Sequence, residues 1–155
     1  MCIRDRLQII DRKKEIFKTS LGEYIAPSKV ENIYNSRSLF VAQCLVLGRS
    51  LKASLVAIIV PDQEYFVEWA NAHGFAGGME ELCTNAVVRK AVLDDITKAG
   101  VEGGLKSFEQ AKAVYLHPKE FSIEAGELTP TQKLVRRKIE VLFATQIEEM
   151  YKSLP

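Results

Sequence analysis

Two apolar segments separated by a polar connection constrain the fold of this chain more than any other feature. Residues 41–47 and 54–60 are rich in β-branched and aliphatic side chains, and Gly48, Ser50 and Lys52 lie between them. This pattern predicts two neighbouring strands joined by a short connection. Because the second segment is almost continuously apolar, we expect it to be buried on both faces. The rest of the chain must therefore build a layered core around this pair.

Capping and turn residues predict helices and a hairpin around the strand pair. Asp62 follows Pro61 and is suited to cap a helix over 63–72. Ser28, with Glu31 three residues later, has the spacing of a capping box at the start of another helix. The further expected elements are a strand at 7–10, hairpin arms at 15–18 and 23–25, helices at 79–85, 86–98, 107–110 and 134–152, and a strand at 113–116.

These elements predict an α+β domain. Their order shows no regular βαβ alternation and no internal repeat. We expect a small, mainly antiparallel sheet with flanking helices, plus a separate N-terminal β-hairpin. At 155 residues the chain is long enough for one domain with its own core. Residues 1–6 have no apolar period and are interpreted as a leader, so the domain is expected to span residues 7–155.

Composition and charge exclude several classes of function. The formal net charge is +1, whereas nucleic-acid-binding domains usually carry a marked basic excess, so no nucleic-acid partner is expected. Cys2, Cys44 and Cys83 are widely separated and form no Cys/His cluster, which argues against a zinc site or a disulfide framework and favours a reducing compartment. The longest apolar run, 55–60, is far shorter than the ~20 residues that span a bilayer.

Lys133 is the first candidate for chemistry. It follows Pro130 and Thr131 just ahead of the predicted last helix, after a long loop. A lysine there is a flexible point charge that can reach a neighbouring domain and bridge a carboxylate and a phosphate. Residue chemistry alone favours an ordinary solvent-exposed lysine. The basic run at 136–138 is likewise interpreted as an exposed helix face rather than a phosphate site.

Arg12, Lys14 and Gly22 form a second group of candidates near the start of the chain. Arg12 has a planar guanidinium suited to phosphate or ribose hydroxyls. Lys14 lies where the first strand gives way to the hairpin, as a hinge would. Gly22 supplies a positive φ or lets a ligand approach the backbone closely. Taken singly, each also fits an ordinary hairpin turn.

Taken together, these residues resemble the C-terminal domain of the adenylate-forming ligases, and most closely that of the long-chain fatty acid–CoA ligases. The hinge motif of the superfamily is matched by Asp-Arg-Lys-Lys at 11–14 and then by Lys18, Gly22, Ala26, Pro27 and Glu31. Its C-terminal lysine motif is matched by Leu-Thr-Pro-Thr-Gln-Lys at 128–133. One extra residue between Lys18 and Gly22, and Thr-Gln where many members have Ser-Gly before the lysine, both fit the long-chain branch. Segments 55–61, 80–83, 104–109 and 116–118 match as well, so the resemblance runs from about residue 7 to the end.

This resemblance implies a two-step reaction that uses ATP and coenzyme A. A long-chain fatty acid attacks ATP to give acyl-AMP and pyrophosphate, and the thiol of coenzyme A then displaces AMP. Lys133 would contact the carboxylate and the α-phosphate in the first step, and Arg12 would bind the nucleotide. Lys14 would be the hinge about which the domain swings, and the loop of Gly22 and Glu23 would then face the coenzyme A channel. Magnesium would serve the intact enzyme without being bound by this domain.

The resemblance also implies a partner, the large N-terminal domain of the same protein, which is absent from this sequence. The isolated chain is therefore expected to fold without turning over substrate. By the same resemblance, the intact protein works at the cytoplasmic face of an organelle membrane such as the endoplasmic reticulum or peroxisome, attached only through upstream residues. Two alternatives stay open: a stand-alone interaction or phosphate-binding module, and an adenylation domain that loads a carrier protein.

Overall fold

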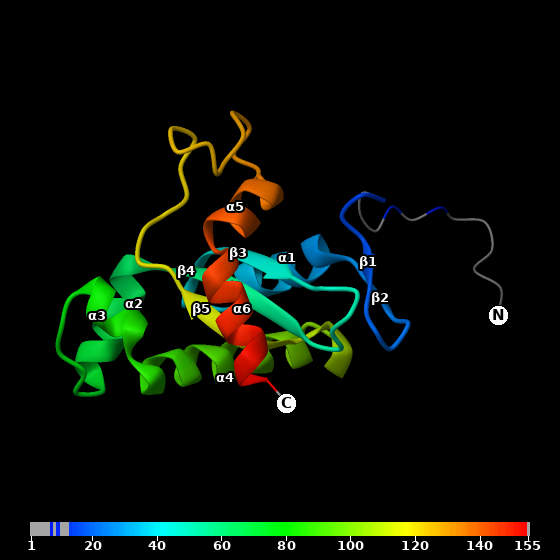
Figure 1. The fold of residues 1–155 in the computed structure, drawn as a ribbon. Coiled ribbons are helices and arrows are strands. Elements are labelled where there is room, and N and C mark those ends of the chain that lie inside the picture. The colour runs from blue at the N-terminus through cyan, green and yellow to red at the C-terminus, as the bar shows by residue number, and fades with distance from the viewer. Residues whose placement is uncertain (1–6, 8, 10–12, 155) are drawn as a thin grey trace.

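The centre of the fold is a three-stranded sheet with β4 in the middle, seen in a computed structural model that describes residues 7, 9 and 13–154 (Figure 1). The strands are β1 (Phe17–Lys18), β2 (Tyr24–Ile25), β3 (Val41–Leu47), β4 (Leu55–Pro61) and β5 (Ala111–Leu116). The helices are α1 (Pro27–Arg37), α2 (Gln63–Ala72), α3 (Met79–Thr84), α4 (Ala86–Glu102), α5 (Arg136–Leu142), α6 (Ala144–Ser153) and the short 3₁₀ helix η1 (Ser107–Glu109). The predicted α+β class is confirmed.

The strand pairing agrees with the sequence pattern and adds one parallel pair. β3 and β4 are antiparallel, with Cys44 opposite Ile59. β5 pairs with β4 in parallel, with Ile58 opposite Tyr115, so the central sheet is mixed. A parallel pair needs a long crossover, which α2, α3 and α4 supply between the two strands. β1 and β2 form the predicted antiparallel hairpin beside this sheet.

β4 is buried along its whole length, which confirms the prediction from its apolar run. Successive side chains of a strand point to opposite faces of the sheet. Leu55, Ala57 and Ile59 accordingly join a large apolar cluster with α1, α2 and α4. The alternate residues of β4 join a second cluster with α5 and α6 on the other face. Helices therefore cover both sides of the sheet (Figure 1).

The helix signals around β4 are confirmed in detail. A carboxylate oxygen of Asp62 accepts a hydrogen bond from the amide of Tyr65 at 2.9 Å, and α2 has the predicted bounds. Phe66 and Ala70 are buried on its core side, as expected. The helix that begins at residue 86 has the side chain of Asn85 as its cap. It continues beyond the predicted end at 98 to Glu102.

The predicted capping box at the start of α1 is wrong. The N-cap is Ala26, and no side chain caps the helix. Ser28 lies inside the first turn, and its hydroxyl donates to Glu15 at 3.5 Å. Glu31 is buried and accepts hydrogen bonds from distant parts of the chain. The spacing of Ser28 and Glu31 was misleading because both side chains form hydrogen bonds with distant residues instead of with the helix backbone.

The predicted last helix over 134–152 is also wrong in its bounds. α5 begins at Arg136, and the helix is interrupted at Phe143, where α6 takes over. The ring of Phe143 packs edge-on against His117, with 4.8 Å between ring centroids, and also against Phe121. The interruption thus coincides with an aromatic cluster, which a period-based prediction cannot detect.

The N-terminal predictions are only partly covered by the structure. Leu7 and Ile9, from the predicted strand at 7–10, are exposed and not in a strand. The predicted leader at 1–6 and the remainder of that strand lie outside the described residues. Across residues 7, 9 and 13–154, no helix has both the length and the apolar character needed to cross a bilayer.

Candidate functional site

Lys133 lies on a small hairpin, and not at the start of a helix. Leu128 and Leu134 form an isolated antiparallel bridge that closes the hairpin. The amide of Thr129 donates to the carbonyl of Lys133 at 2.8 Å, and the amide of Gln132 donates to the carbonyl of Thr129 at 2.8 Å. The hydroxyl of Thr129 also accepts from the amide of Lys133 at 3.1 Å. The backbone of Lys133 is therefore held on both sides, while its side chain is exposed.

The residue before Lys133 has an unusual backbone conformation. Gln132 has a φ of 60°, and it is the one non-glycine residue with positive φ in the described part of the chain. A left-handed residue after a turn with proline at its second position is typical of a three-residue hairpin loop. Non-glycine residues in this region cost free energy and are often found at functional sites.

A polar groove of about 530 Å³ separates the Lys133 hairpin from α1. The polar side chains that line it include Ser28, Asn32, Asn35, Thr129, Thr131 and Lys133. The lining also includes two cationic side chains, Lys133 and Arg136, and two carboxylates, Glu15 and Glu31, so the groove is polar with balanced charge. Glu15, Glu31 and Arg136 are connected to one another by short polar contacts.

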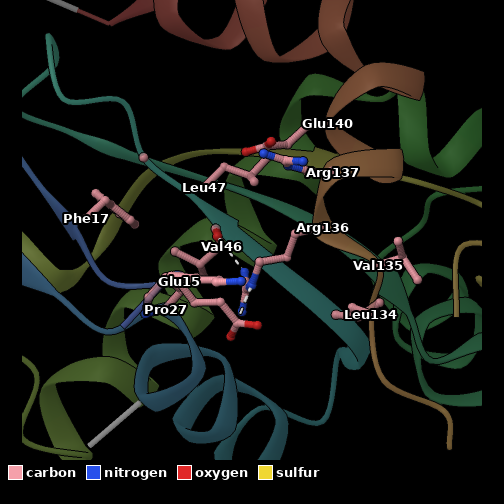
Figure 2. Close-up of a pocket in the computed structure, with 12 residues that line it drawn as sticks. Glu15, Phe17, Pro27, Val46, Leu47, Leu134, Val135, Arg136, Arg137 and Glu140 are labelled. Atoms are coloured by element: carbon pink, nitrogen blue, oxygen red, sulfur yellow. Dashed lines mark hydrogen bonds and ion pairs between the residues drawn. The ribbon is translucent and has the colours of Figure 1, made fainter. Parts of the chain in front are cut away.

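Arg136 connects four segments of the chain beneath the Lys133 hairpin. Its Nη1 and Nη2 donate to the two carboxylate oxygens of Glu31, at 2.7 and 2.6 Å. Nη1 also donates to the carbonyl of Val46 on β3 at 3.2 Å, and Nε lies 3.7 Å from Oε2 of Glu15. Figure 2 shows the guanidinium of Arg136 between Val46 and Glu15. The prediction that 136–138 is simply an exposed helix face is therefore wrong for Arg136, whose side chain is 19% exposed.

Glu31 completes this arrangement. Its side chain is 9% exposed, and Oε1 also accepts a hydrogen bond from the amide of Val46 at 2.7 Å. Burial of a carboxylate costs free energy unless its oxygens accept hydrogen bonds. For Glu31 the guanidinium of Arg136 and the amide of Val46 supply these donors. The neighbouring Cys44 thiol is buried, and burial, reinforced by the charge of Glu31, raises its pKa well above the usual value. Cys44 is thus held as a neutral packing residue.

The predicted hinge residue Lys14 is exposed and borders a second groove, which also contains Glu15, Phe17 and Arg136 (Figure 2). Both grooves therefore share Glu15, Leu134 and Arg136. The structure thus connects the predicted hinge and the Lys133 hairpin through shared residues. Arg12, the predicted nucleotide contact, lies outside the described residues.

Gly22 and Glu23 lie in the turn between β1 and β2. In Figure 1 this hairpin, in blue, lies well away from the orange loop that leads into α5. Gly22 has a φ of +85°, as the turn prediction required. The amide of Thr19 donates to the carbonyl of Glu23 at 2.9 Å, and the amide of Ser20 donates to the carbonyl of Lys52 at 3.2 Å. The loop is therefore seated on the β3–β4 connection. The chain presents two separate candidate surfaces, one carrying Lys133 and one carrying Gly22.

The described residues contain no cluster of three or more histidine, cysteine, aspartate or glutamate side chains suited to a metal. His117 instead stacks on Phe121, with 5.8 Å between ring centroids. Burial lowers its pKa below the usual histidine value. These contacts make His117 a packing residue of the aromatic cluster.

No protein-family model matches the chain. Among solved structures, the chain is similar to the A domain of carboxylic acid reductase from Segniliparus rugosus, in complex with AMP and a co-purified carboxylic acid. The TM-score is 0.79 and the sequence identity is 29%, over 94% of this chain and 21% of that one. It is also similar to the adenylation domain of a carboxylate reductase from Mycobacterium chelonae, with a TM-score of 0.78 and 26% identity over 93% of this chain and 20% of that one. The fold is therefore one found within adenylation domains.

Sequence comparison is more specific. The chain is 53% identical over 148 residues to long-chain-fatty-acid–CoA ligase 1 of Homo sapiens and to that of Cavia porcellus, and each match covers 96% of this chain. It is 48% identical over 150 residues to long chain acyl-CoA synthetase 6, peroxisomal, of Arabidopsis thaliana. Nearly the whole chain therefore matches one segment of long-chain fatty acid–CoA ligases. It spans 21% of the length of each of these three relatives.

Proposed function

We propose that this chain is the mobile C-terminal domain of an ATP-dependent long-chain fatty acid–CoA ligase, with residues 7–155 forming the domain. The observation that carries the proposal is the exposed Lys133 on a hairpin whose backbone is held by its own hydrogen bonds. The 53% identity to ligases across nearly the whole chain supports the same function. The activity requires the large N-terminal domain, which would hold ATP, magnesium and the fatty acid.

In the proposed first step, the fatty acid carboxylate attacks the α-phosphorus of ATP, a new O–P bond forms, and pyrophosphate leaves. The ammonium of Lys133 would lie between the carboxylate and the α-phosphate and stabilise the negative charge that develops there. Arg12 would bind the nucleotide. Because the hairpin already holds the backbone of Lys133, only its side chain has to be ordered on binding.

In the proposed second step, the domain turns about Lys14, Lys133 withdraws, and the loop of Gly22 and Glu23 meets coenzyme A. The thiol gives up its proton and attacks the acyl carbonyl, a thioester bond forms, and AMP leaves. The separation of the two candidate surfaces on this domain supports such an alternation, because one rigid-body rotation can exchange them. Lys14 is exposed and lies just before the β1–β2 hairpin, which suits the hinge.

The first experiment compares the two half-reactions of the intact protein. We expect Lys133→Ala to lower the rate of acyl-AMP formation by about 10²–10³-fold. Thioester formation from preformed acyl-AMP should change far less. Lys98→Ala is a matched control, because Lys98 is an exposed lysine on α4. An equal loss in both half-reactions would remove Lys133 from the proposed role.

The second experiment tests the hinge. Lys14→Pro fixes φ at a position that must change conformation during the swing, so we expect the thioester half-reaction to slow more than adenylate formation. No selective effect on the second half-reaction would contradict the assignment of Lys14. The isolated chain should give no acyl-CoA when mixed with ATP, a long-chain fatty acid and coenzyme A.

The two alternatives are less well supported. A stand-alone binding module does not account for identity that extends over 96% of the chain to ligases of much greater length. An adenylation domain that loads a carrier protein has one point in its favour, a 30% identical structure of an A-PCP didomain from carboxylic acid reductase. The identity to the ligases is higher. For the intact protein we propose the cytoplasmic face of an organelle membrane, in line with the peroxisomal name of the Arabidopsis relative.

A further inference from the structure

We propose that Arg136 is a positioning residue that couples the hinge to the catalytic lysine, so that Lys133 reaches the adenylate site at a fixed place. This inference rests on the proposed function of Lys133 and Lys14. Arg136 would not touch substrate. It would act by holding the first residue after the hinge, α1 and the Lys133 hairpin in one rigid unit.

Arg136 with its partners Glu31, Val46 and Glu15 is called the clamp. Arg136 makes a two-point pair with Glu31 at 2.7 and 2.6 Å, and it donates to the carbonyl of Val46 at 3.2 Å. Glu31 is tied in turn to the amide of Val46 on the central sheet. The planar guanidinium makes this geometry specific, and a lysine ammonium cannot reproduce the two-point pairing. The clamp is therefore fixed to the core of the domain and has a defined orientation.

One side of the clamp reaches the hinge. Glu15 directly follows Lys14 in the sequence, and its Oε2 lies 3.7 Å from Nε of Arg136. The same oxygen accepts from the hydroxyl of Ser28 in the first turn of α1. The chain that leaves the hinge is thus held against α1 from its first residue.

The other side reaches Lys133. Arg136 is the first residue of α5 and comes three residues after Lys133. The amide of Val135 donates to the carbonyl of Glu127 at 2.8 Å, and the bridge between Leu128 and Leu134 closes the hairpin next to it. A short, hydrogen-bonded path therefore joins the clamp to the lysine backbone.

The consequence concerns the accuracy of the domain swing. A rotation about Lys14 brings Lys133 to the nucleotide at a place set by the angle between the hinge segment and the hairpin. If the clamp loosens, that angle varies, and a misplacement of about 1 Å can cost up to about 100-fold in rate. The step that uses Lys133 should suffer, whereas the step that uses the Gly22 surface should not.

The test is a double-mutant cycle in the intact protein, followed in both half-reactions. We expect Arg136→Lys to lower the maximal rate of acyl-AMP formation roughly tenfold, with less effect on KM and on thioester formation from preformed acyl-AMP. In the Lys133→Ala background the same change should alter the rate by less than about twofold, because Arg136 acts through Lys133. Arg49→Lys is the matched control, since Arg49 forms an exposed 2.8 Å ion pair with Glu148 and lines neither groove.

A milder variant keeps the test valid if Arg136→Lys impairs folding. Glu15→Gln leaves the pair between Arg136 and Glu31 intact and removes a charge from a side chain that is 28% exposed. We expect it to give a smaller loss, again confined to acyl-AMP formation and again absent in the Lys133→Ala background. Equal effects of Arg136→Lys with and without Lys133, or equal losses in both half-reactions, would overturn the inference while leaving the proposed function intact. No effect of Lys133→Ala alone would instead overturn the proposed function.

Discussion

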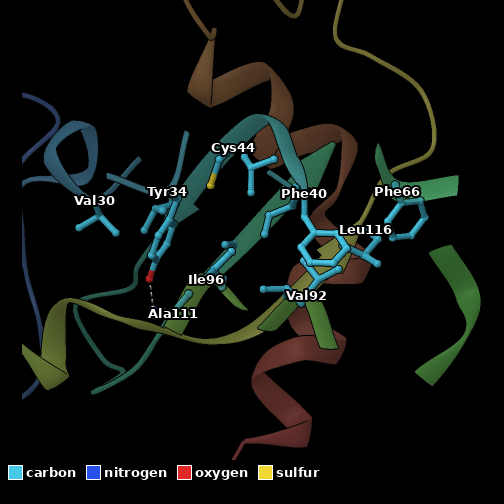
Figure 3. Close-up of a cluster of buried hydrophobic side chains, with 14 of the residues drawn as sticks. Val30, Tyr34, Phe40, Cys44, Phe66, Val92, Ile96, Ala111 and Leu116 are labelled. Carbon is cyan, nitrogen blue, oxygen red and sulfur yellow. Dashed lines mark hydrogen bonds between the residues drawn. The ribbon is translucent and has the colours of Figure 1, made fainter. Parts of the chain in front are cut away.

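The hydroxyl of Tyr34 accepts a hydrogen bond from the backbone amide of Ala111 at 3.0 Å, and so joins the middle of α1 to the start of β5 (Figure 3). Tyr34 is fully buried. Tyr34→Phe keeps the ring but leaves the amide of Ala111 without this partner. We expect the free energy of unfolding to fall by about 1–3 kcal/mol, measured by urea denaturation of the 155-residue chain. Tyr24→Phe, at a residue that is 69% exposed, should change it by less than about 0.5 kcal/mol.

The same tyrosine predicts a loss of stability at alkaline pH. Burial raises the pKa of Tyr34 from 10.0 to about 12, and the hydrogen bond from Ala111 opposes this only in part. The pKa of Tyr34 is higher in the folded state than in the unfolded state. The stabilisation that protonated Tyr34 gives to the folded chain is therefore complete below pH 10 and declines as the pH rises toward 12. The difference in unfolding free energy between the wild type and Tyr34→Phe should therefore shrink by roughly 1 kcal/mol between pH 9 and 11. If the difference in unfolding free energy stays constant between about pH 9 and 11, the pKa of Tyr34 is not raised in the folded state.

Gly48 is required by the ring of Phe17, which seats the β1–β2 hairpin on the central sheet. A Cβ at residue 48 would lie 2.0 Å from the Phe17 ring and 2.9 Å from a methyl carbon of Leu55. Gly48→Ala should therefore displace Phe17 and lower the free energy of unfolding by about 1–3 kcal/mol. Gly78→Ala is the matched control, because a Cβ there meets nothing within 4 Å. If both variants unfold at the same urea concentration as the wild type, the packing of Phe17 on Gly48 is not what holds the hairpin.

The backbone of Gln132 predicts opposite effects for two substitutions. With φ at 60°, Gln132→Gly should be neutral or should stabilise the chain by up to about 1 kcal/mol, because glycine adopts this conformation without strain. Gln132→Val should destabilise it, because β-branched residues tolerate the left-handed region poorly. In the intact protein we expect Gln132→Val to slow acyl-AMP formation while Gln132→Gly retains it. Similar rates for the two variants would show that this turn does not position Lys133.

Several elements were predictable because their causes lie within a few residues of one another. The pairing of β3 with β4 follows from two neighbouring apolar runs, and the start of α2 follows from Asp62, whose carboxylate needs only the amide of Tyr65. The positive φ of Gly22 also follows from local turn chemistry. Lys133, Lys14, Gly22, Glu23 and Arg12 were identified by resemblance to a family, and the structure describes all of them except Arg12.

The clamp at Arg136 could not be predicted in this way. Arg136 and Glu31 are 105 residues apart, and each had a plausible local interpretation, one as a charged helix face and the other as half of a capping box. The parallel pairing of β5 and the helix interruption at Phe143 were not predictable for a similar reason. Both depend on contacts between segments that are far apart in the sequence.

The amino-acid sequence by itself determined the α+β class, the central strand pair and the resemblance to long-chain fatty acid–CoA ligases, because these depend on local pattern and on motifs in a fixed order. It also named Lys133 as the candidate lysine, which stays a prediction. Only the tertiary structure decided that Arg136, three residues after Lys133, pairs with Glu31 on α1. The physical reason is that a buried ion pair needs partners from distant segments to offset the cost of removing two charges from water, and folding alone brings those segments together.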